Sequence, residues 1–225
     1  MLLTPIHQDG WPFVAILLAA AAILFMLWQP LGWIGLAATG WCAYFFRNPE
    51  RVTPLRDGLI VSAADGLVQD IDNAVPPPAL DMPAEPVVRI GVFLSLFDVH
   101  IARAPVAGVV AKTSYAPGRF HSAASELGQA ENERLAVRLA RDGKPDLAVV
   151  LIAGQVARRI RCGLSSGDGL RAGERIGLIR FGSRVEVYLP PAVAPLVCVG
   201  QRLIAGETVI ADEASEETAR QGEAR

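Results

Sequence analysis

An uncharged apolar run near the N-terminus sets the first constraint on this chain. Residues 11–46 contain no Asp, Glu, Lys, Arg or His, and about 20 apolar residues already cross the hydrocarbon core of a bilayer. The run therefore predicts a membrane-anchoring segment within residues 1–48. A Gln-Pro-Leu-Gly interruption at residues 29–32 divides it into two halves, so we expect a transmembrane helical hairpin rather than one tilted helix.

The charges around this run predict its orientation. The first ten residues contain no Lys or Arg, unlike a secretory signal peptide, so the segment is expected to stay attached. Arg47, Arg51 and Arg56 follow the run closely, and positive residues prefer the cytoplasmic side. We therefore expect a protein of the cell (inner) membrane whose remaining residues face the cytoplasm.

The composition excludes several classes of protein. With 52% hydrophobic and 20% charged residues, the chain is expected to fold rather than remain disordered. A formal net charge of -2, without a basic stripe, argues against a nucleic-acid partner. Cys42, Cys162 and Cys198 are too scattered for a disulfide framework or a metal site, which fits a reducing compartment.

Beyond the apolar run, the hydrophobic pattern is typical of β-structure. Period-two alternation and intervening turn residues predict a β-rich domain over residues 49–212. A proline-rich loop is expected at 73–86, helix only around 123–134, and a flexible tail at 213–225. The predicted strands lie at 59–62, 87–96, 106–112, 135–139, 147–152, 175–179 and 185–189.

Glycine-containing segments beginning at Gly173 and Gly200 echo each other as strand, turn and strand. They resemble the units of barrel-sandwich domains that carry lipoyl or biotinyl groups. The predicted hairpin tips hold no lysine, so the carrier function does not transfer. The expected fold class is mainly β, as a β-rich α+β fold with barrel-sandwich-like elements and the N-terminal hairpin.

Few residues are suited to familiar catalytic motifs. His7, His100 and His121 are the three histidines, and the sequence has no HExxH, CxxC or P-loop pattern. Metal and nucleotide chemistry are therefore not expected. The segment around Gly182-Ser183 also lacks the G-x-S-x-G elbow of a serine hydrolase, which points to another serine chemistry.

The residues around this Gly-Ser pair carry a specific resemblance. Residues 180–185 read Arg-Phe-Gly-Ser-Arg-Val, which resembles the self-cleavage segment of the short, bacterial type of phosphatidylserine decarboxylase. The resemblance covers nearly the whole chain except the extreme C-terminal tail. Its other motifs, in order, are Tyr-Phe-Phe-Arg-Asn-Pro-Glu-Arg at 44–51, Ser-Ala-Ala-Asp-Gly at 62–66, Phe-Leu-Ser-Leu-Phe-Asp-Val-His-Ile-Ala-Arg-Ala-Pro at 93–105 and Asn-Glu-Arg at 132–134.

The resemblance implies that the chain is a proenzyme that cuts itself. An isolated Gly-Ser pair is usually a turn, although a glycine also lets the Ser183 hydroxyl approach the Gly182 carbonyl. The resemblance implies cleavage there into chains 1–182 and 183–225, which stay associated. It further implies that Ser183 becomes a covalent pyruvoyl cofactor, which forms a Schiff base with the serine amine of the phospholipid substrate.

Further site residues follow from the same resemblance. His100, within the motif at 93–105, matches the catalytic histidine of the family. An imidazole suits this role because it can accept and return a proton near neutral pH. Asp65 matches the carboxylate that orients it, although a β-turn residue has the same local sequence. A second histidine of longer relatives is replaced by Arg103, so the residue that activates Ser183 is left open. His121 is the fallback for the acid and base role.

The sequence thus predicts a carboxy-lyase that converts phosphatidylserine to phosphatidylethanolamine and carbon dioxide. Two alternatives stay open: a decarboxylase of an archaeal-type phosphoserine ether lipid, and a non-catalytic, membrane-tethered barrel-sandwich adaptor. Arg119, Arg134 and Arg184 are candidates to contact the lipid phosphate, and the sequence does not choose among them. It also leaves open whether the protein is a homo-oligomer.

Overall fold

The chain folds into a helical unit and a β unit, each described by itself. The computed structural model describes residues 4–119, 121, 131–154, 159–180 and 183–223. The helical unit comprises Met1–Glu50 with Phe97–Val99, and the β unit comprises Arg51–Leu96 with His100–Arg225.

The helical unit contains η1 (Gln8–Gly10), α1 (Trp11–Leu27) and α2 (Gln29–Phe45). Both α-helices carry a proline, Pro12 or Pro30, within their first two positions, where the missing amide proton breaks no helical hydrogen bond. Trp28 has an extended backbone between the helices. Pro30 therefore opens a second helix instead of kinking a single long one.

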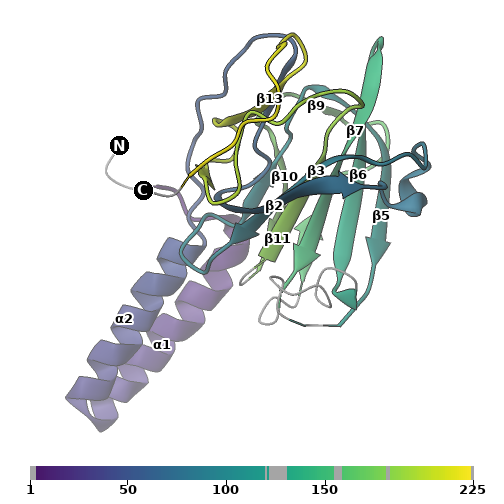
Figure 1. Cartoon of the computed structure of the whole chain (residues 1–225). Coiled ribbons are helices and arrows are strands. Elements are labelled where there is room, and N and C mark those ends of the chain that lie inside the picture. The colour runs from purple at the N-terminus through teal and green to yellow at the C-terminus, as the bar shows by residue number, and fades with distance from the viewer. Residues whose placement is uncertain (1–3, 120, 122–130, 155–158, 181–182, 224–225) are drawn as a thin grey trace. The chain divides into compact units, whose positions relative to one another are not determined.

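The two helices pack side by side as a hairpin (Figure 1). Small residues permit this close approach, since a Cβ atom on Gly32 would lie 2.2 Å from Cγ of Phe25. At the open end of the hairpin, the His7 amide donates to the Phe46 carbonyl at 2.7 Å. Among the described residues, Gln8–Leu27 is the one helical stretch long and apolar enough to cross a bilayer.

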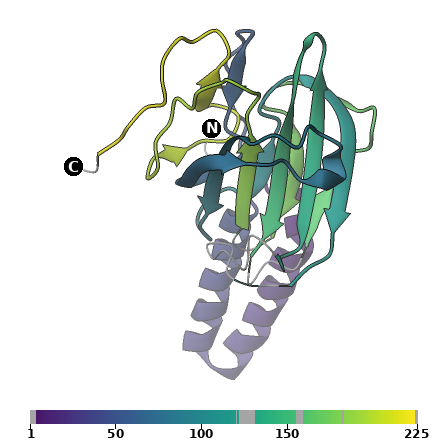
Figure 2. The ribbon, with the colours of Figure 1, turned by 45° about the vertical axis from the view of Figure 1, so that its right-hand side comes forward.

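The β unit is built from antiparallel strand pairs. Its largest sheet has the order β12-β2-β3-β11-β7-β6-β5-β9 and curls over its length (Figure 1 and Figure 2). Smaller sheets have the orders β4-β10-β8 and β1-β13. The strands are β1 (Leu59–Val61), β2 (Gly66–Ala74), β3 (Val87–Leu94), β4 (Ile101–Arg103), β5 (Gly108–Ala116), β6 (Arg134–Arg141), β7 (Lys144–Ala153), β8 (Ile160–Cys162), β9 (Gly169–Leu170), β10 (Arg175–Ile179), β11 (Ser183–Tyr188), β12 (Arg202–Leu203) and β13 (Val209–Asp212).

The side chains of strand β11 alternate between an apolar and a polar face of the sheet. Its Val185 and Val187 are fully buried in the main apolar core. Successive side chains of a strand point to opposite faces, so Arg184, Glu186 and Tyr188 lie on the other face of the sheet. This alternation decides which residues can share a site with Ser183.

The predicted fold class is confirmed, because the chain is mainly β with an apolar helix near the N-terminus. All seven predicted strand segments overlap observed strands. Strand β2 was not predicted, because its sequence alternates poorly and holds the polar residues Gln69, Asp70, Asp72 and Asn73. Its neighbour β3 pairs with it along nearly its whole length, which no local pattern reveals.

Two predicted segments need correction. The helix expected at 123–134 falls mostly on residues 123–130, which lie outside the described residues. Its last residue is not helical, because Arg134 opens β6 and pairs with Ile152 of β7. The loop expected at 73–86 begins later, since β2 continues through Ala74, and it contains the short helix η2 (Pro78–Leu80).

Candidate active site

Ser183 opens β11 inside the large sheet. It pairs with Leu94 of β3 on one side and with Ala153 of β7 on the other. Its side chain is fully buried, and within the part of the chain that the structure describes, its Oγ has no hydrogen-bond partner. Leaving a buried hydroxyl unsatisfied costs about 1–3 kcal/mol. A serine with a purely structural role is expected to avoid this cost by forming a hydrogen bond.

The surroundings of Ser183 are apolar. Ser183 shares a sheet face with Val185, and its neighbours Leu94 and Ala153 are buried. The Oγ atom is therefore sheltered from water. Gly182, the other half of the predicted cleavage site, lies outside the described residues.

His100 lies directly before β4 and is fully buried. Its carbonyl accepts a hydrogen bond from the amide of Ile179 at 3.0 Å. Ile179 ends β10, and Ser183 follows it by four positions in the chain. The structure thus links the backbone of His100 to the strand that leads into Ser183.

Asp65 lies in the turn between β1 and β2, with its side chain mostly buried. Its Oδ1 accepts the Ala205 amide at 2.8 Å, and its Oδ2 accepts from Nη2 of Arg51 at 2.6 Å. The same turn is tied to β4, because the Ala63 carbonyl accepts the Arg103 amide at 2.8 Å. The segments that carry Asp65 and His100 are therefore hydrogen-bonded neighbours.

Arg103 is buried where longer relatives are expected to carry the second histidine. Its Nη1 donates to the Gly173 carbonyl at 2.7 Å. Burial lowers the pKa of Arg103 to about 10, helped by the charges of Arg175 and Arg51. A guanidinium with that pKa is still protonated at neutral pH, so Arg103 supplies positive charge and does not act as a base.

Asn132 belongs to the Asn-Glu-Arg motif at 132–134, and the structure gives it a distinct place. It is buried, and its Nδ2 donates to the carbonyls of Ala153 at 2.7 Å and His121 at 2.8 Å. Its Oδ1 accepts the His121 amide at 2.7 Å. An asparagine directly before a strand pattern, within the Asn-Glu-Arg motif, is the sequence signal that could have identified it.

The fallback histidine and two of the candidate arginines differ in how exposed their side chains are. His121 Nε2 lies 3.4 Å from Oε2 of Glu131, and both side chains are partly exposed. Arg119 is largely exposed and lies 3.7 Å from the same carboxylate. Arg184 is fully buried and pairs with Asp70, so it is not available to a lipid phosphate as the sequence had suggested.

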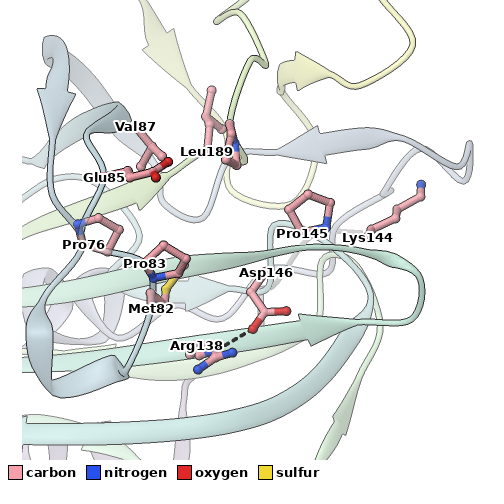
Figure 3. A pocket seen from close by; sticks show the side chains of 11 residues that line it. Pro76, Met82, Pro83, Glu85, Val87, Arg138, Lys144, Pro145, Asp146 and Leu189 are labelled. Carbon is pink, nitrogen blue, oxygen red and sulfur yellow. Dashed lines mark hydrogen bonds and ion pairs between the residues drawn. The ribbon is translucent and has the colours of Figure 1, made fainter.

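The hollow drawn in Figure 3 lies away from Ser183. It measures about 280 Å³ and is lined by the loop after β2, the turn end of β6 and β7, and Leu189 beyond β11. Leu189 follows Ser183 by six residues, about 20 Å along a strand. Three of the charged groups that line the hollow have partners: Arg138 pairs with Asp146, as Figure 3 shows, and Lys144 pairs with Asp57 and Glu213.

The comparisons with known proteins agree with the motifs. A sequence model of the phosphatidylserine decarboxylase family matches residues 38–211. The phosphatidylserine decarboxylase proenzyme of Paramagnetospirillum magneticum is 56% identical over 221 residues, covering 98% of this chain and 92% of the relative. The proenzymes of Cereibacter sphaeroides and Ruegeria pomeroyi are 53% and 56% identical, covering 98% and 93% of this chain and 95% and 96% of the relatives. Similarity of this extent shows that the chain belongs to the phosphatidylserine decarboxylase family.

Proposed function

We propose that this chain cuts itself between Gly182 and Ser183 and then decarboxylates phosphatidylserine to phosphatidylethanolamine and carbon dioxide. The observation that carries the proposal is the buried Ser183 Oγ, which lacks a hydrogen-bond partner among the described residues. Membership of the family and the word proenzyme in the names of the relatives support the same reading.

The self-cleavage begins with attack of Ser183 Oγ on the carbonyl carbon of Gly182. The peptide C–N bond breaks, the nitrogen takes the hydroxyl proton, and an ester joins the two residues. Removal of the Ser183 Cα proton then breaks the Cβ–O bond and releases the carboxylate of Gly182. Water replaces the nitrogen of the resulting dehydroalanine, ammonia leaves, and the small chain begins with a pyruvoyl group.

Residue 183 fits such a group. The apolar side chains of its neighbours Leu94 and Ala153 offer no hydrogen bonds that would compete, and pairing on both sides holds its strand. A pyruvoyl group supplies an electron sink when the substrate carboxylate leaves as carbon dioxide.

His100 and Asp65 complete the proposed machinery. We assign to His100 the proton that replaces the departing carboxyl group, because an imidazole can donate and accept near neutral pH. Asp65 is proposed to orient His100. Its own carboxylate is held by Arg51 and the Ala205 amide. Buried, protonated Arg103 adds positive charge to the same set of neighbouring segments.

The helical unit is proposed to anchor the enzyme at the membrane that contains its substrate. Its helices expose many large apolar side chains, Ile16, Met26 and Leu27 among them. The arginines that follow the hairpin favour a cytoplasmic position for the β unit. After cleavage, β11 stays paired with β3 and β7, which keeps the two chains associated.

The proposal is tested on purified full-length protein with Ser183→Ala and, as the matched control, Ser215→Ala in the C-terminal tail. Wild type and the control should separate into two chains on a denaturing gel and release carbon dioxide from phosphatidylserine. Ser183→Ala should remain a single inactive chain. A parallel assay with a phosphoserine ether lipid tests the alternative substrate. Normal cleavage of Ser183→Ala would falsify the site assignment, and an uncut, inactive wild type would support the adaptor.

A further inference from the structure

Arg184, the residue after the proposed cleavage site, is buried in a network of charged groups. Its side chain has zero exposure. Its Nη1 and Nη2 donate to the two carboxylate oxygens of Asp70 at 2.6 Å each, and its Nε donates to Oε1 of Glu186 at 2.9 Å. Forked pairs of this kind fix geometry as well as charge.

The guanidinium reaches across an entire strand to make these bonds. Asp70 belongs to β2, and β3 lies between β2 and β11. The crossing is possible at Gly91 of β3, where an added Cβ atom would lie 2.0 Å from Nη2 of Arg184. Gly91 pairs with Asp70 on one side and Glu186 on the other, so its missing side chain opens the path.

Further partners compensate the buried charge. Arg89 donates to Glu186 at 3.2 Å and to Asp72 at 2.6 Å, and the Tyr188 hydroxyl donates to Glu186 at 3.0 Å. Burial by itself lowers the pKa of Arg184, but Asp70 and Glu186 outweigh it and raise the pKa overall. Arg184 therefore stays charged, and a charge buried with partners is costly to disturb.

We propose that Arg184 and Asp70 form a clamp that holds residue 183 in place once the chain has been cut. The proposal rests on the proposed self-cleavage. Before cleavage, the preceding residues tether Ser183 covalently. After cleavage, residue 183 is a chain terminus, and termini fray unless they are tied down.

The clamp ties the second residue of the small chain to β2 of the large chain. It acts from the face opposite Ser183, so Arg184 is a positioning residue. Its expected influence is large, because misplacing reacting groups by about 1 Å can slow a reaction by about 100-fold.

The test uses Asp70→Asn and Arg184→Lys, each as processed enzyme and each combined with Ser183→Ala as an uncut chain. Asp146→Asn is the matched control, because Asp146 also pairs with an arginine of a neighbouring strand, Arg138, but takes no part in the network around Arg184. We would measure kcat and KM for phosphatidylserine, together with hydrogen exchange of the peptide that begins β11.

In the clamp variants, kcat should fall by about 10-fold to 100-fold, the range expected for a misplaced reacting group, while KM changes little. Exchange at the start of β11 should rise in the cut protein and stay near the wild-type level in the uncut chain. Asp146→Asn should behave like wild type in both measurements.

Three results would overturn the clamp. The first is normal kcat in both processed variants. The second is an equal rise of hydrogen exchange in cut and uncut chains. The third is failure of both variants to fold as uncut chains, which would assign the pair to folding. Absence of cleavage in wild type is a different failure, because it removes the proposed function together with the clamp.

Discussion

Ser183 lies directly opposite Ala153 in the ladder between β11 and β7, and Ala153 is held in turn by Asn132. The Asn132 amide donates to the carbonyls of Ala153 and His121 and accepts the His121 amide. One buried side chain therefore fixes the end of the strand that borders the proposed nucleophile. Its removal should affect both stability and processing.

Asn132→Ala should lower the free energy of unfolding by about 1–3 kcal/mol, because it leaves buried backbone groups without partners. It should also slow self-cleavage, which a time course on denaturing gels would measure. Asn73→Ala, at an exposed position of β2, is the control. Wild-type stability and cleavage of Asn132→Ala would show that Asn132 does not support the site.

His100→Gln should reduce decarboxylation by about 100-fold or more, the contribution typical of a general acid or base. The measurement is kcat of whatever fraction is processed, so that any effect on cleavage is separated from turnover. His121→Gln is the matched comparison. A greater loss of kcat in His121→Gln than in His100→Gln would move the proton-transfer role to His121.

The titration of Tyr188 should lower the free energy of unfolding at alkaline pH. Burial, together with the charge of Glu186, raises the pKa of Tyr188 above its ordinary value of 10.0. The folded state then keeps a proton that the unfolded state releases, so the free energy of unfolding falls as pH rises above 10.0. Urea unfolding across this range would measure the fall.

Tyr188→Phe removes the titrating group and should flatten this alkaline fall in the free energy of unfolding. Tyr44→Phe, at an exposed position in the helical unit, should leave it unchanged. An equally steep fall in Tyr188→Phe would show that other groups govern the alkaline stability.

Leu18→Glu should weaken retention by the membrane. Leu18 is about half exposed on α1, so the substitution adds a charge to the lipid-facing surface without opening the helix contact. Such a charge costs about 2.5–3.5 kcal/mol at the centre of a membrane helix. Carbonate extraction of membranes would measure the retained fraction, with Val52→Glu as the control outside the helices. Equal retention of both variants would contradict insertion of α1.

The mainly β fold could be predicted because most strands carry a local apolar pattern. Val185 and Val187 alternate with polar residues, and the segment that contains them was assigned correctly. Strand β2 could not be predicted in this way. Its Asp70 and Asp72 face arginines from other strands, and such pairing becomes visible only when the sheet is assembled.

The candidate site was predictable to a different degree. Ser183, His100 and Asp65 could be named from their motifs, and the structure places them on segments linked by backbone pairing. Arg184 was one of three candidate lipid contacts, and its burial could not be predicted, because it depends on Gly91 of β3 leaving room for the guanidinium to reach Asp70, two strands away from Arg184. Local sequence shows neither the crossing nor the partner.

The central claim is that Ser183 becomes the blocked end of a new chain. Intact mass spectrometry of the purified wild-type protein, before and after treatment with a carbonyl-trapping reagent, tests it most directly. We predict chains 1–182 and 183–225, the smaller one lighter by one ammonia than a chain that begins with serine, and shifted in mass by the reagent. A single full-length chain, or a small chain with a free N-terminal serine, would contradict the account.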